Sequence, residues 1–391
     1  MIMFKLNQIE QISDKIRNMF IPCAIFAISL LSFYTYQPFS DNICKNLHFA
    51  VYFISFAGFI ALLYFNRGRT IFLFLIIIMS YTLINFLKHI YADTYLSSPF
   101  YISLSTLLPI NLILFYFINP RNLLSKSNTW LLLGIFIQFS LAEILARHQI
   151  GIGINLSYLP HTLNLLSSLA FLIIIFLTFY NSIHSGSITD YHLFFVSLSQ
   201  ALTFYYSNTA SGLCIFTTCS LLCLISAFIQ NIYFETYKDP LTGLDSRNSY
   251  ILHSKNFPIK YCIGIISIDD YDKLGKNFGR RIRNILTKLI SRQISELQKS
   301  ENIYRYNPDE FIIIFNNLNK KESFEQLENI RRSIASSEFQ YSSKRKNLKL
   351  TISACVAEKK RSDASSFEVL QRADKALQKT RMFSHNVTSQ A

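Results

Sequence analysis

Long apolar runs fill the first 234 residues and restrict what this part of the chain can fold into. A helix needs about 20 mostly apolar residues to cross the roughly 30 Å hydrocarbon core of a bilayer. Eight stretches approach this length, and the seventh has the weakest signal: residues 19–36, 47–65, 70–87, 100–118, 129–146, 162–180, 191–206 and 211–234. The sequence therefore predicts an α-helical transmembrane bundle of about eight spans over residues 1–235.

Charged residues are distributed unevenly between the two parts of the chain. Residues 1–234 hold 10 of the 38 Lys and Arg residues and 6 of the 24 Asp and Glu residues, so most charge lies after them. If the N-terminus is cytoplasmic, eight basic residues fall in inside segments and three in outside segments. The inside residues are Lys5, Lys15, Arg17, Arg67, Arg69, Arg121, Lys126 and Lys238, and the outside residues are Lys45, Lys88 and Arg147. The positive-inside rule then places both termini in the cytoplasm.

Few residues of the apolar half suggest chemistry. Glu143 is the clearest ionisable residue at membrane depth, and Arg147 follows it one helical turn later, so the pair is either a stimulus site or an i,i+4 ion pair near a helix end. The seven cysteines show no metal-binding spacing and are interpreted as small buried residues. The net charge of +14 favours a basic face near anionic lipid, and nucleic-acid binding is not expected.

After residue 235 the pattern changes to short apolar strands alternating with amphipathic helices, which is typical of an α+β domain. The expected strands are 261–268, 303–306, 310–315 and 348–357, and the expected helices are 280–297, 323–336 and 367–382. Only Asn307, Pro308 and Asp309 separate the second and third strands, which favours a tight hairpin. Residues 236–391 are therefore predicted to form a second, water-soluble domain.

Five short segments of this second domain resemble, in order and spacing, the motifs of GGDEF domains. They are KDPLTGLDSR at 238–247, SIDDY at 267–271, RYNPDEF at 305–311, TISACV at 351–356 and ADKAL at 373–377. GGDEF domains are the diguanylate cyclases that condense two GTP molecules into cyclic di-GMP. The resemblance implies an α+β fold similar to polymerase palms and nucleotide cyclases, a bacterial inner-membrane location, and Mg²⁺ as the cofactor if nucleotide binding persists.

The resemblance also implies where metal ions and catalysis would be located. In the family, the first Asp of D-I-D and the third residue of GGDEF hold Mg²⁺, and these positions here are Ser267 and Asp309. Asp269, two residues further along the same strand, points to the same face and is the remaining candidate ligand. Asp309 and Glu310 are accordingly the candidate catalytic residues, in a vestigial form because Ser267 replaces an expected Asp.

Other positions implied by the family have also changed. The two glycines that let the hairpin backbone approach a triphosphate correspond to Asn307 and Pro308, and proline has no N–H to donate to phosphate. The guanine-reading residues fall at Gly275 and Asn284 by ungapped alignment, and the phosphate-binding residues fall at Arg381 and His385. Asn284 and Arg381 are the candidate nucleotide-binding residues.

Three functional hypotheses follow. The first is a membrane-anchored GGDEF protein with a degenerate site, acting as a regulatory or interaction module in cyclic di-GMP signalling. The second is an active diguanylate cyclase with an unusual site, and the third is a transporter-like membrane protein with a regulatory domain. The expected partners are the lipid bilayer, a second copy of the chain or an active cyclase, and weakly bound GTP.

Overall fold

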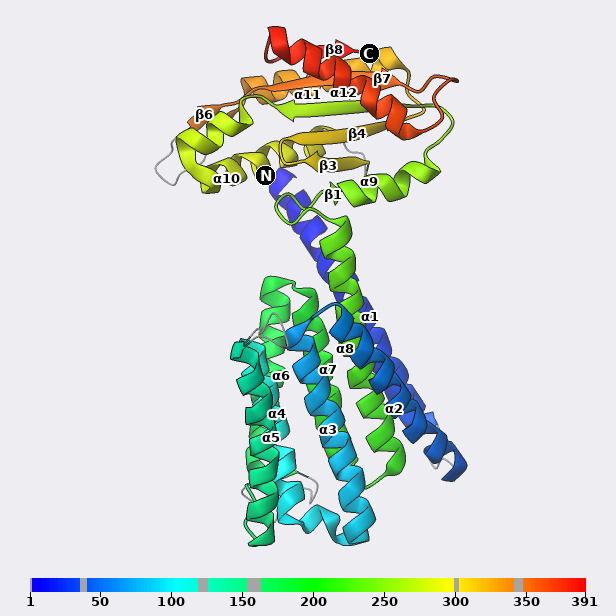
Figure 1. Cartoon of the computed structure of the whole chain (residues 1–391), viewed down its shortest axis with the longest axis vertical. Coiled ribbons are helices and arrows are strands. Elements are labelled where there is room, and N and C mark those ends of the chain that lie inside the picture. Colours follow the sequence, from blue (N-terminus) through cyan, green and yellow to red (C-terminus); the bar gives the residue numbers. More distant parts are fainter. Residues whose placement is uncertain (1, 36–40, 119–125, 153–162, 299–301, 341–346) are drawn as a thin grey trace. The chain divides into compact units, whose positions relative to one another are not determined.

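A computed structural model describes residues 2–35, 41–118, 126–152, 163–298, 302–340 and 347–391. The chain divides into two compact units, Met1–Asn231 and Ile232–Ala391 (Figure 1). Helix α8 runs without interruption from the first unit into the first residues of the second.

In its described residues, the first unit contains eight long helices and one short 3₁₀ helix. Seven of the long helices are long and apolar enough to cross a membrane, whereas α7 does not reach this level, in agreement with the weak signal of the seventh predicted span. Tyr36, Arg121 and Thr162, which belong to the predicted spans and loops, lie outside the described residues. The elements are α1 (Ile2–Thr35), α2 (Asp41–Tyr64), α3 (Gly68–Tyr91), η1 (Ala92–Ser97), α4 (Pro99–Phe117), α5 (Lys126–Arg147), α6 (Leu165–Ser185), α7 (Ile188–Tyr205) and α8 (Ala210–Tyr237).

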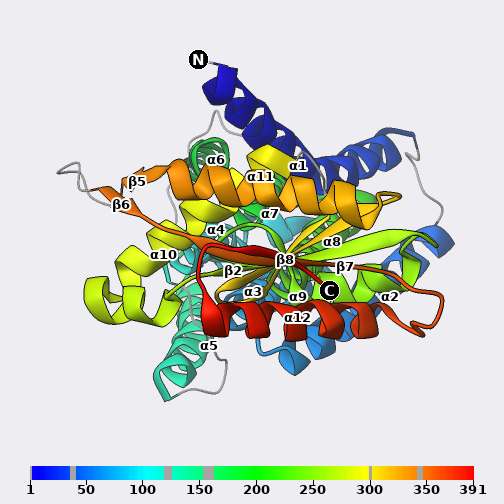
Figure 2. The same cartoon turned by 90° about the horizontal axis from the view of Figure 1, so that it is seen from above.

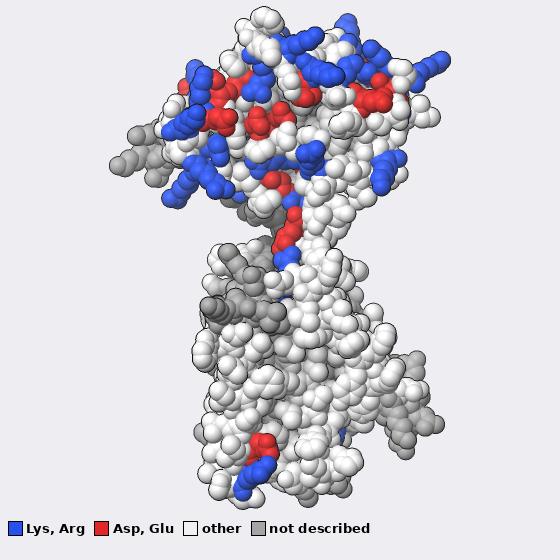
Figure 3. Space-filling model, viewed as in Figure 1, with Lys and Arg blue, Asp and Glu red and all other residues white. Residues whose placement is uncertain are grey.

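Large apolar side chains cover the outer surface of this helical unit. Phe20, Phe53, Phe136 and Phe176 are each more than half exposed. Figure 3 shows charged side chains gathered over the second unit and almost none on the visible face of the helices. So much exposed apolar surface is stable only in a non-aqueous surrounding, which supports a membrane-spanning role.

Glu143 and Arg147 form the ion pair that their spacing in α5 predicts. The Arg147 Nη2 atom lies 2.6 Å from Glu143 Oε1, and both side chains are more than half exposed. The pair therefore has the geometry of an i,i+4 ion pair at the last residue of α5.

The second unit contains a six-stranded mixed sheet in the order β1-β3-β4-β2-β7-β8. Strand β2 pairs antiparallel with both β4 and β7, while β1–β3 and β7–β8 pair in parallel. The predicted strand 348–357 divides in two, because β6 pairs with β5 in a separate sheet. The strands are β1 (Asp245–Ser246), β2 (Tyr261–Ile268), β3 (Ile303–Asn307), β4 (Glu310–Asn316), β5 (Glu338–Gln340), β6 (Asn347–Lys349), β7 (Ile352–Glu358) and β8 (Thr388–Gln390).

Helices cover both faces of this sheet, as Figure 2 shows for α11 on one side and α12 on the other. Helix α10 consists of two helical segments joined by a kink at Gly279, whose φ is 82°, and the segment after the kink corresponds to the predicted helix 280–297. Helix α11 begins with a capping box formed by Asn319 and Glu322. The helices are α9 (Arg247–His253), η2 (Ser254–Asn256), α10 (Tyr271–Gln298), α11 (Lys320–Ser336) and α12 (Ser366–Phe383).

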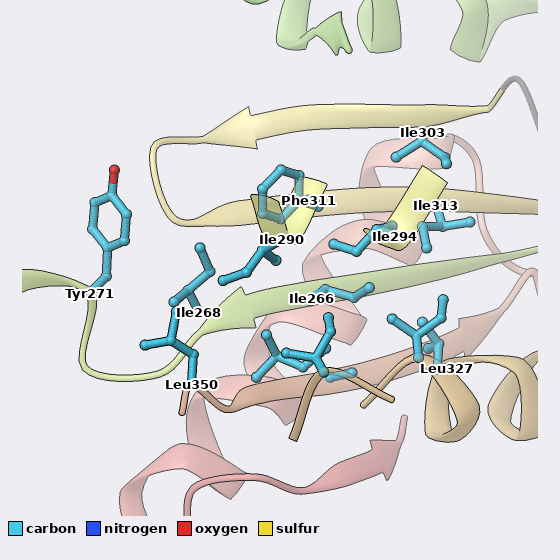
Figure 4. Packing of buried hydrophobic residues seen from close by; sticks show 14 of the residues in the cluster. Ile266, Ile268, Tyr271, Ile290, Ile294, Ile303, Phe311, Ile313, Leu327 and Leu350 are labelled. Carbon is cyan, nitrogen blue, oxygen red and sulfur yellow. The ribbon is translucent and has the colours of Figure 1, made fainter. Parts of the chain in front are cut away.

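Successive residues of β2 point to opposite faces of the sheet and enter two different cores. Ile266 and Ile268 pack with α10 and α11 around Phe311 (Figure 4). Ile263 and Ile265 pack with α12 on the other face. All eight β2 residues are buried, including the polar Ser267, as expected of a strand that is covered on both faces.

Gly264 provides a test of this packing. A Cβ atom at this position would lie 2.8 Å from Phe315 Cε2 and 3.0 Å from Leu327 Cδ1, both of which are buried. We expect Gly264→Ala to destabilise the second unit by about 1–3 kcal/mol through overpacking. Hydrogen-exchange mass spectrometry of the full chain in nanodiscs should show faster exchange in β2, β4 and α11.

The matched control is Gly134→Ala in α5, where the added Cβ would meet no atom within 4 Å. This change should leave exchange in the sheet unaltered. Unchanged protection of β2 in the Gly264→Ala variant would show that the two-faced core is packed differently from this description.

Candidate functional site

The ends of three neighbouring segments of the sheet, β2, β7 and the β3–β4 hairpin, meet at one end of its central strands. Ser267, near the end of β2, is paired with Glu310 of β4 on one side and with Ser353 of β7 on the other. The hairpin between β3 and β4 holds Asp309 next to it, and the backbone carbonyl of Asp309 accepts a hydrogen bond from the N–H of Ile268. The structure therefore places Ser267, Asp309 and Glu310, which the sequence predicts to share a site, within one small region.

Arg381 of α12 reaches into this region and contacts Ser267. Its Nη1 atom donates a 2.8 Å hydrogen bond to Ser267 Oγ and lies 4.0 Å from Asp309 Oδ2. Ser267 Oγ in turn donates to the same Asp309 oxygen over 3.2 Å. The result is a compact Ser267–Arg381–Asp309 cluster in which a guanidinium group lies beside the two positions where the family resemblance implies metal ligands.

Asp269 is buried and its carboxylate is occupied by other contacts. Oδ1 accepts a hydrogen bond from Ser353 Oγ at 2.8 Å, and Oδ2 accepts from Thr351 Oγ1 at 2.8 Å and from the backbone N–H of Asn386 at 2.9 Å. His385 Nδ1 lies 3.4 Å from Oδ1. Asp269 therefore attaches the chain after α12 to the end of β7, which leaves little freedom for it to act as a metal ligand.

Arg305 ties the hairpin to the opening motif of the domain. Its Nη1 atom donates to both carboxylate oxygens of Asp239, at 2.8 and 3.0 Å, and its Nη2 atom donates to the Pro308 carbonyl at 2.8 Å. Asp239 also accepts hydrogen bonds from the Thr242 backbone N–H and hydroxyl. Burial raises the pKa of Asp239, but the hydrogen bonds from Thr242 and Arg305 outweigh it and lower the net pKa.

The hairpin tip is also closed by its own side chains. Asn307 Nδ2 donates a 2.5 Å hydrogen bond to Glu310 Oε2 across the turn. Burial raises the pKa of Glu310, and the nearby carboxylates of Asp309 and Asp374 raise it further, while the Asn307 hydrogen bond and the Arg381 charge offset part of the shift. Glu310 is thus a half-buried acid engaged within the hairpin.

Gly275 and Asn284, the positions that the sequence alignment assigns to guanine recognition, do not come together in one pocket. A pocket of about 250 Å³ is lined by Asp272, Gly275, Lys276, Arg280 and Arg283. Arg283 lies over Gly275, where a Cβ would come within 2.8 Å of its Nη1 atom, and its guanidinium stacks 4.7 Å from the Tyr271 ring centroid. Asn284 is half-buried on α10 and is not among the residues that line this pocket.

The side chains around Ser267 do not fit a Mg²⁺ ion. Mg²⁺ requires near-octahedral oxygen ligands at about 2.1 Å, usually including one or two carboxylates. Asp309 faces the Arg381 guanidinium, and the oxygens of Asp269 already accept hydrogen bonds. Over the described part of the chain, no group of three or more His, Cys, Asp and Glu residues is arranged to hold a metal ion.

Sequence reasoning did not anticipate three features of this region. These are the bridging position of Arg381, the burial of Asp269 against β7 and the stacking of Arg283 over Gly275. Arg305 and Asp239 belong to motifs recognised in the sequence, but their contact depends on the parallel pairing of β1 with β3. Such pairing joins residues about 60 positions apart, and local sequence patterns carry no signal for it.

Glu310 gives a pH-dependent prediction. A carboxyl group whose pKa is raised on folding stabilises the fold at low pH and loses that contribution as the pH rises through the folded-state pKa, which lies above the ordinary 4.5. We therefore expect Glu310→Gln to slow hydrogen exchange of β3 and β4 a few-fold at pH 7. The difference from wild type should disappear near pH 4, where Glu310 is protonated.

Glu325→Gln, at an exposed position of α11, removes one carboxylate without touching the hairpin and is the control. A Glu310→Gln variant that exchanges faster than wild type at pH 7 would contradict the pKa direction.

Comparison with known proteins identifies the second unit. Residues 236–386 match the family model described as "Diguanylate cyclase, GGDEF domain". Among curated proteins, none matches the chain significantly.

Solved structures with similarity to the chain include three bacterial GGDEF proteins. One is the coiled coil and GGDEF domain of DgcB from Caulobacter crescentus in complex with c-di-GMP, at 20% identity, covering 43% of this chain and 92% of that one, with a TM-score of 0.39. The FimX GGDEF domain from Pseudomonas aeruginosa is 17% identical, and the match covers 39% of this chain and 99% of that one, with a TM-score of 0.37. Diguanylate cyclase SiaD from the same organism, in complex with its activator SiaC, is 17% identical. The match covers 64% of this chain and 91% of that one, with a TM-score of 0.38.

The motifs in order, the six-stranded sheet with helices on both faces and the match to the family model agree with one another. Residues 236–386 of this chain are a GGDEF domain of the diguanylate cyclase family, joined to a region of helices apolar enough to span a membrane.

Proposed function

We propose that this protein is a membrane-anchored member of cyclic di-GMP signalling whose GGDEF domain acts by contact rather than by catalysis. The observation that carries the proposal is the Ser267–Arg381–Asp309 cluster. A serine stands at one implied metal position, and a guanidinium group lies 4.0 Å from the carboxylate at the other. The positive charge of Arg381 opposes a divalent cation at the same place.

Joining two triphosphates depends on charge stabilisation at the phosphates, for which metal ions are the main source in phosphoryl transfer. The hairpin that would approach those phosphates holds Pro308, whose carbonyl accepts a hydrogen bond from Arg305, and Asn307, whose amide is bound to Glu310. Each lost feature removes a separate part of transition-state stabilisation, and a single such donor is worth about 10²–10³-fold in rate. Losing several together leaves no measurable cyclase rate.

The proposed location is the bacterial inner membrane, with both termini in the cytoplasm. The excess of basic residues in the segments assigned to the inside supports this orientation. A reporter that is active only in the cytoplasm, fused after Ala391, should be active in whole cells.

The proposed partner of the domain is a second GGDEF domain, either from another copy of this chain or from an active cyclase. Diguanylate cyclase SiaD, one of the similar structures, was solved with an activator protein bound. In this chain α8 leads into the domain without a long coiled-coil segment, so the membrane helices would set the pairing. Crosslinking in native membranes, with a reagent that does not react with cysteine, should therefore trap a dimer. Recovery of monomer alone would argue against pairing of this chain with itself.

The central prediction concerns turnover of GTP. The full chain in nanodiscs, incubated with GTP and Mg²⁺ or Mn²⁺, should form no cyclic di-GMP, because the residues around Ser267 do not provide a metal site. Liquid chromatography with mass spectrometry would measure the product, with an active GGDEF protein as the positive control. Formation of product at the rate of that control would establish the alternative, an active diguanylate cyclase.

A rebuilt site tests the reason for the expected inactivity. We expect the triple variant Ser267→Asp, Asn307→Gly and Pro308→Gly to remain inactive, because Gly275 and Asn284 still stand at the positions that ungapped alignment assigns to guanine recognition. Calorimetry with GTP, with and without Mg²⁺, separates weak nucleotide binding from none. Cyclase activity of the triple variant would show that Ser267, Asn307 and Pro308 alone account for the inactivity of the wild-type site.

A further inference from the structure

Three polar side chains from three helices converge inside the first unit. His48 of α2, Tyr81 of α3 and Cys214 of α8 lie within hydrogen-bonding distance of one another. His48 Nδ1 is 2.5 Å from the Tyr81 hydroxyl oxygen, and Cys214 Sγ is 3.3 Å from each of them. Tyr81 and Cys214 are almost fully buried, at 2% and 0% exposure. Intramembrane ionisable groups are costly and usually have a function.

A fourth group adds positive charge to this cluster. Lys88 lies seven residues after Tyr81 on α3 and therefore on the same face of that helix. Its Nζ atom lies 5.4 Å from the ring centroid of Tyr95. Basic neighbours such as lysine and histidine favour the thiolate form of a cysteine, which is its nucleophilic form. The same positive charge disfavours a metal cation at this place.

The position of the cluster in the helices suits a stimulus site. Cys214 is the fifth residue of α8, roughly 6 Å along the helix from its start at 1.5 Å per residue. The other end of α8 is Tyr237, and the match to the GGDEF family begins at residue 236. A chemical change at Cys214 therefore acts on the helix that leads directly into the signalling domain.

We propose that Cys214 is a redox-active thiol and that its oxidation by a small peroxide is the stimulus detected by the membrane region. A neutral molecule of this size is the oxidant class suited to a side chain that is fully covered. The proposal concerns the input of the protein and does not depend on whether the GGDEF domain is catalytic.

The chemical step balances with the groups present. The thiol proton of Cys214 passes to His48 Nδ1, and the sulfur attacks one peroxide oxygen. The S–O bond forms as the O–O bond breaks, and the departing oxygen takes the proton from His48. A thiol and hydrogen peroxide thus give a sulfenic acid and water, with sulfur oxidised and peroxide reduced.

The product then changes the packing of α8. Cys214 has no exposed surface, so an added oxygen atom must displace its neighbours, and small-to-large changes in a filled core shift side chains and backbone. The Tyr81 hydroxyl, 3.3 Å from the sulfur, is placed to donate a hydrogen bond to the new oxygen.

The experiment uses the full chain in nanodiscs, treated with hydrogen peroxide in the presence of dimedone, a reagent that labels sulfenic acids. Chymotryptic peptides analysed by mass spectrometry report the labelling of each cysteine. Cys223, buried on the same helix, is the internal control. We expect Cys214 to be labelled at least tenfold faster than Cys223, and labelling at equal rates would overturn the proposal.

Two variants test the role of the neighbours. His48→Asn should lower the Cys214 rate to that of Cys223, whereas His89→Asn, the same change at an exposed residue near the end of α3, should leave it unchanged. A His48→Asn variant that is labelled as fast as wild type would remove His48 from the mechanism and overturn the proposal. Because the ratio of Cys214 to Cys223 labelling is measured within the wild-type protein, the proposal remains testable even if a variant does not fold.

Discussion

Strand β2 is the element around which the GGDEF domain is organised. It is hydrogen-bonded to β4 along one edge and to β7 along the other, and its two faces are buried against different sets of helices. A strand in this position cannot shift by one residue without moving every side chain to the opposite face. The register of β2 therefore determines where Ser267 and Asp269 are held, and with them the chemistry available at this edge of the sheet.

The side chains at that edge form contacts within the protein itself. Arg381 is bound to Ser267, Asp269 to Ser353 and the chain after α12, and Arg305 to Asp239 and the Pro308 carbonyl. These contacts satisfy the polar groups of the region from within the domain itself. The fold of the family is retained because its cores are apolar and independent of substrate, while the polar edge can change without loss of the core.

In the helical unit, apolar side chains lie on the outside and polar side chains meet on the inside, unlike in the GGDEF domain. Phenylalanines such as Phe20 and Phe176 are exposed, whereas polar groups such as His48 and Tyr81 meet in the interior. In a bilayer this arrangement places apolar surface against lipid and polar side chains against one another. The proposed stimulus site and the proposed interaction domain are then connected by a single covalent element, helix α8.

Much of the architecture follows from the sequence because local patterns carry it. Apolar runs of about 20 residues predict the membrane helices, and the short motifs from Asp239 to Leu377 predict the GGDEF fold and the identity of its site positions. The mostly apolar run of residues 261–268, in which Ser267 is the exception, predicts β2, since a strand buried on both faces has no regular polar alternation. The replacement of an expected Asp by Ser267 is also visible in the sequence, because it is a matter of residue identity at a motif position.

Only the tertiary structure decides how the changed positions are filled. Arg381 and Ser267 are 114 residues apart, and nothing local indicates that the guanidinium donates to the hydroxyl. The sequence predicts Asp269 on the same strand as Ser267, but β2 ends at Ile268, and the hydrogen bonds that Asp269 accepts come from Thr351 and Ser353, more than 80 residues away. His48, Tyr81 and Cys214 likewise come from three helices. The sequence determines which residues are present and the local elements they form, whereas side-chain contacts between distant elements depend on packing that only the folded chain establishes.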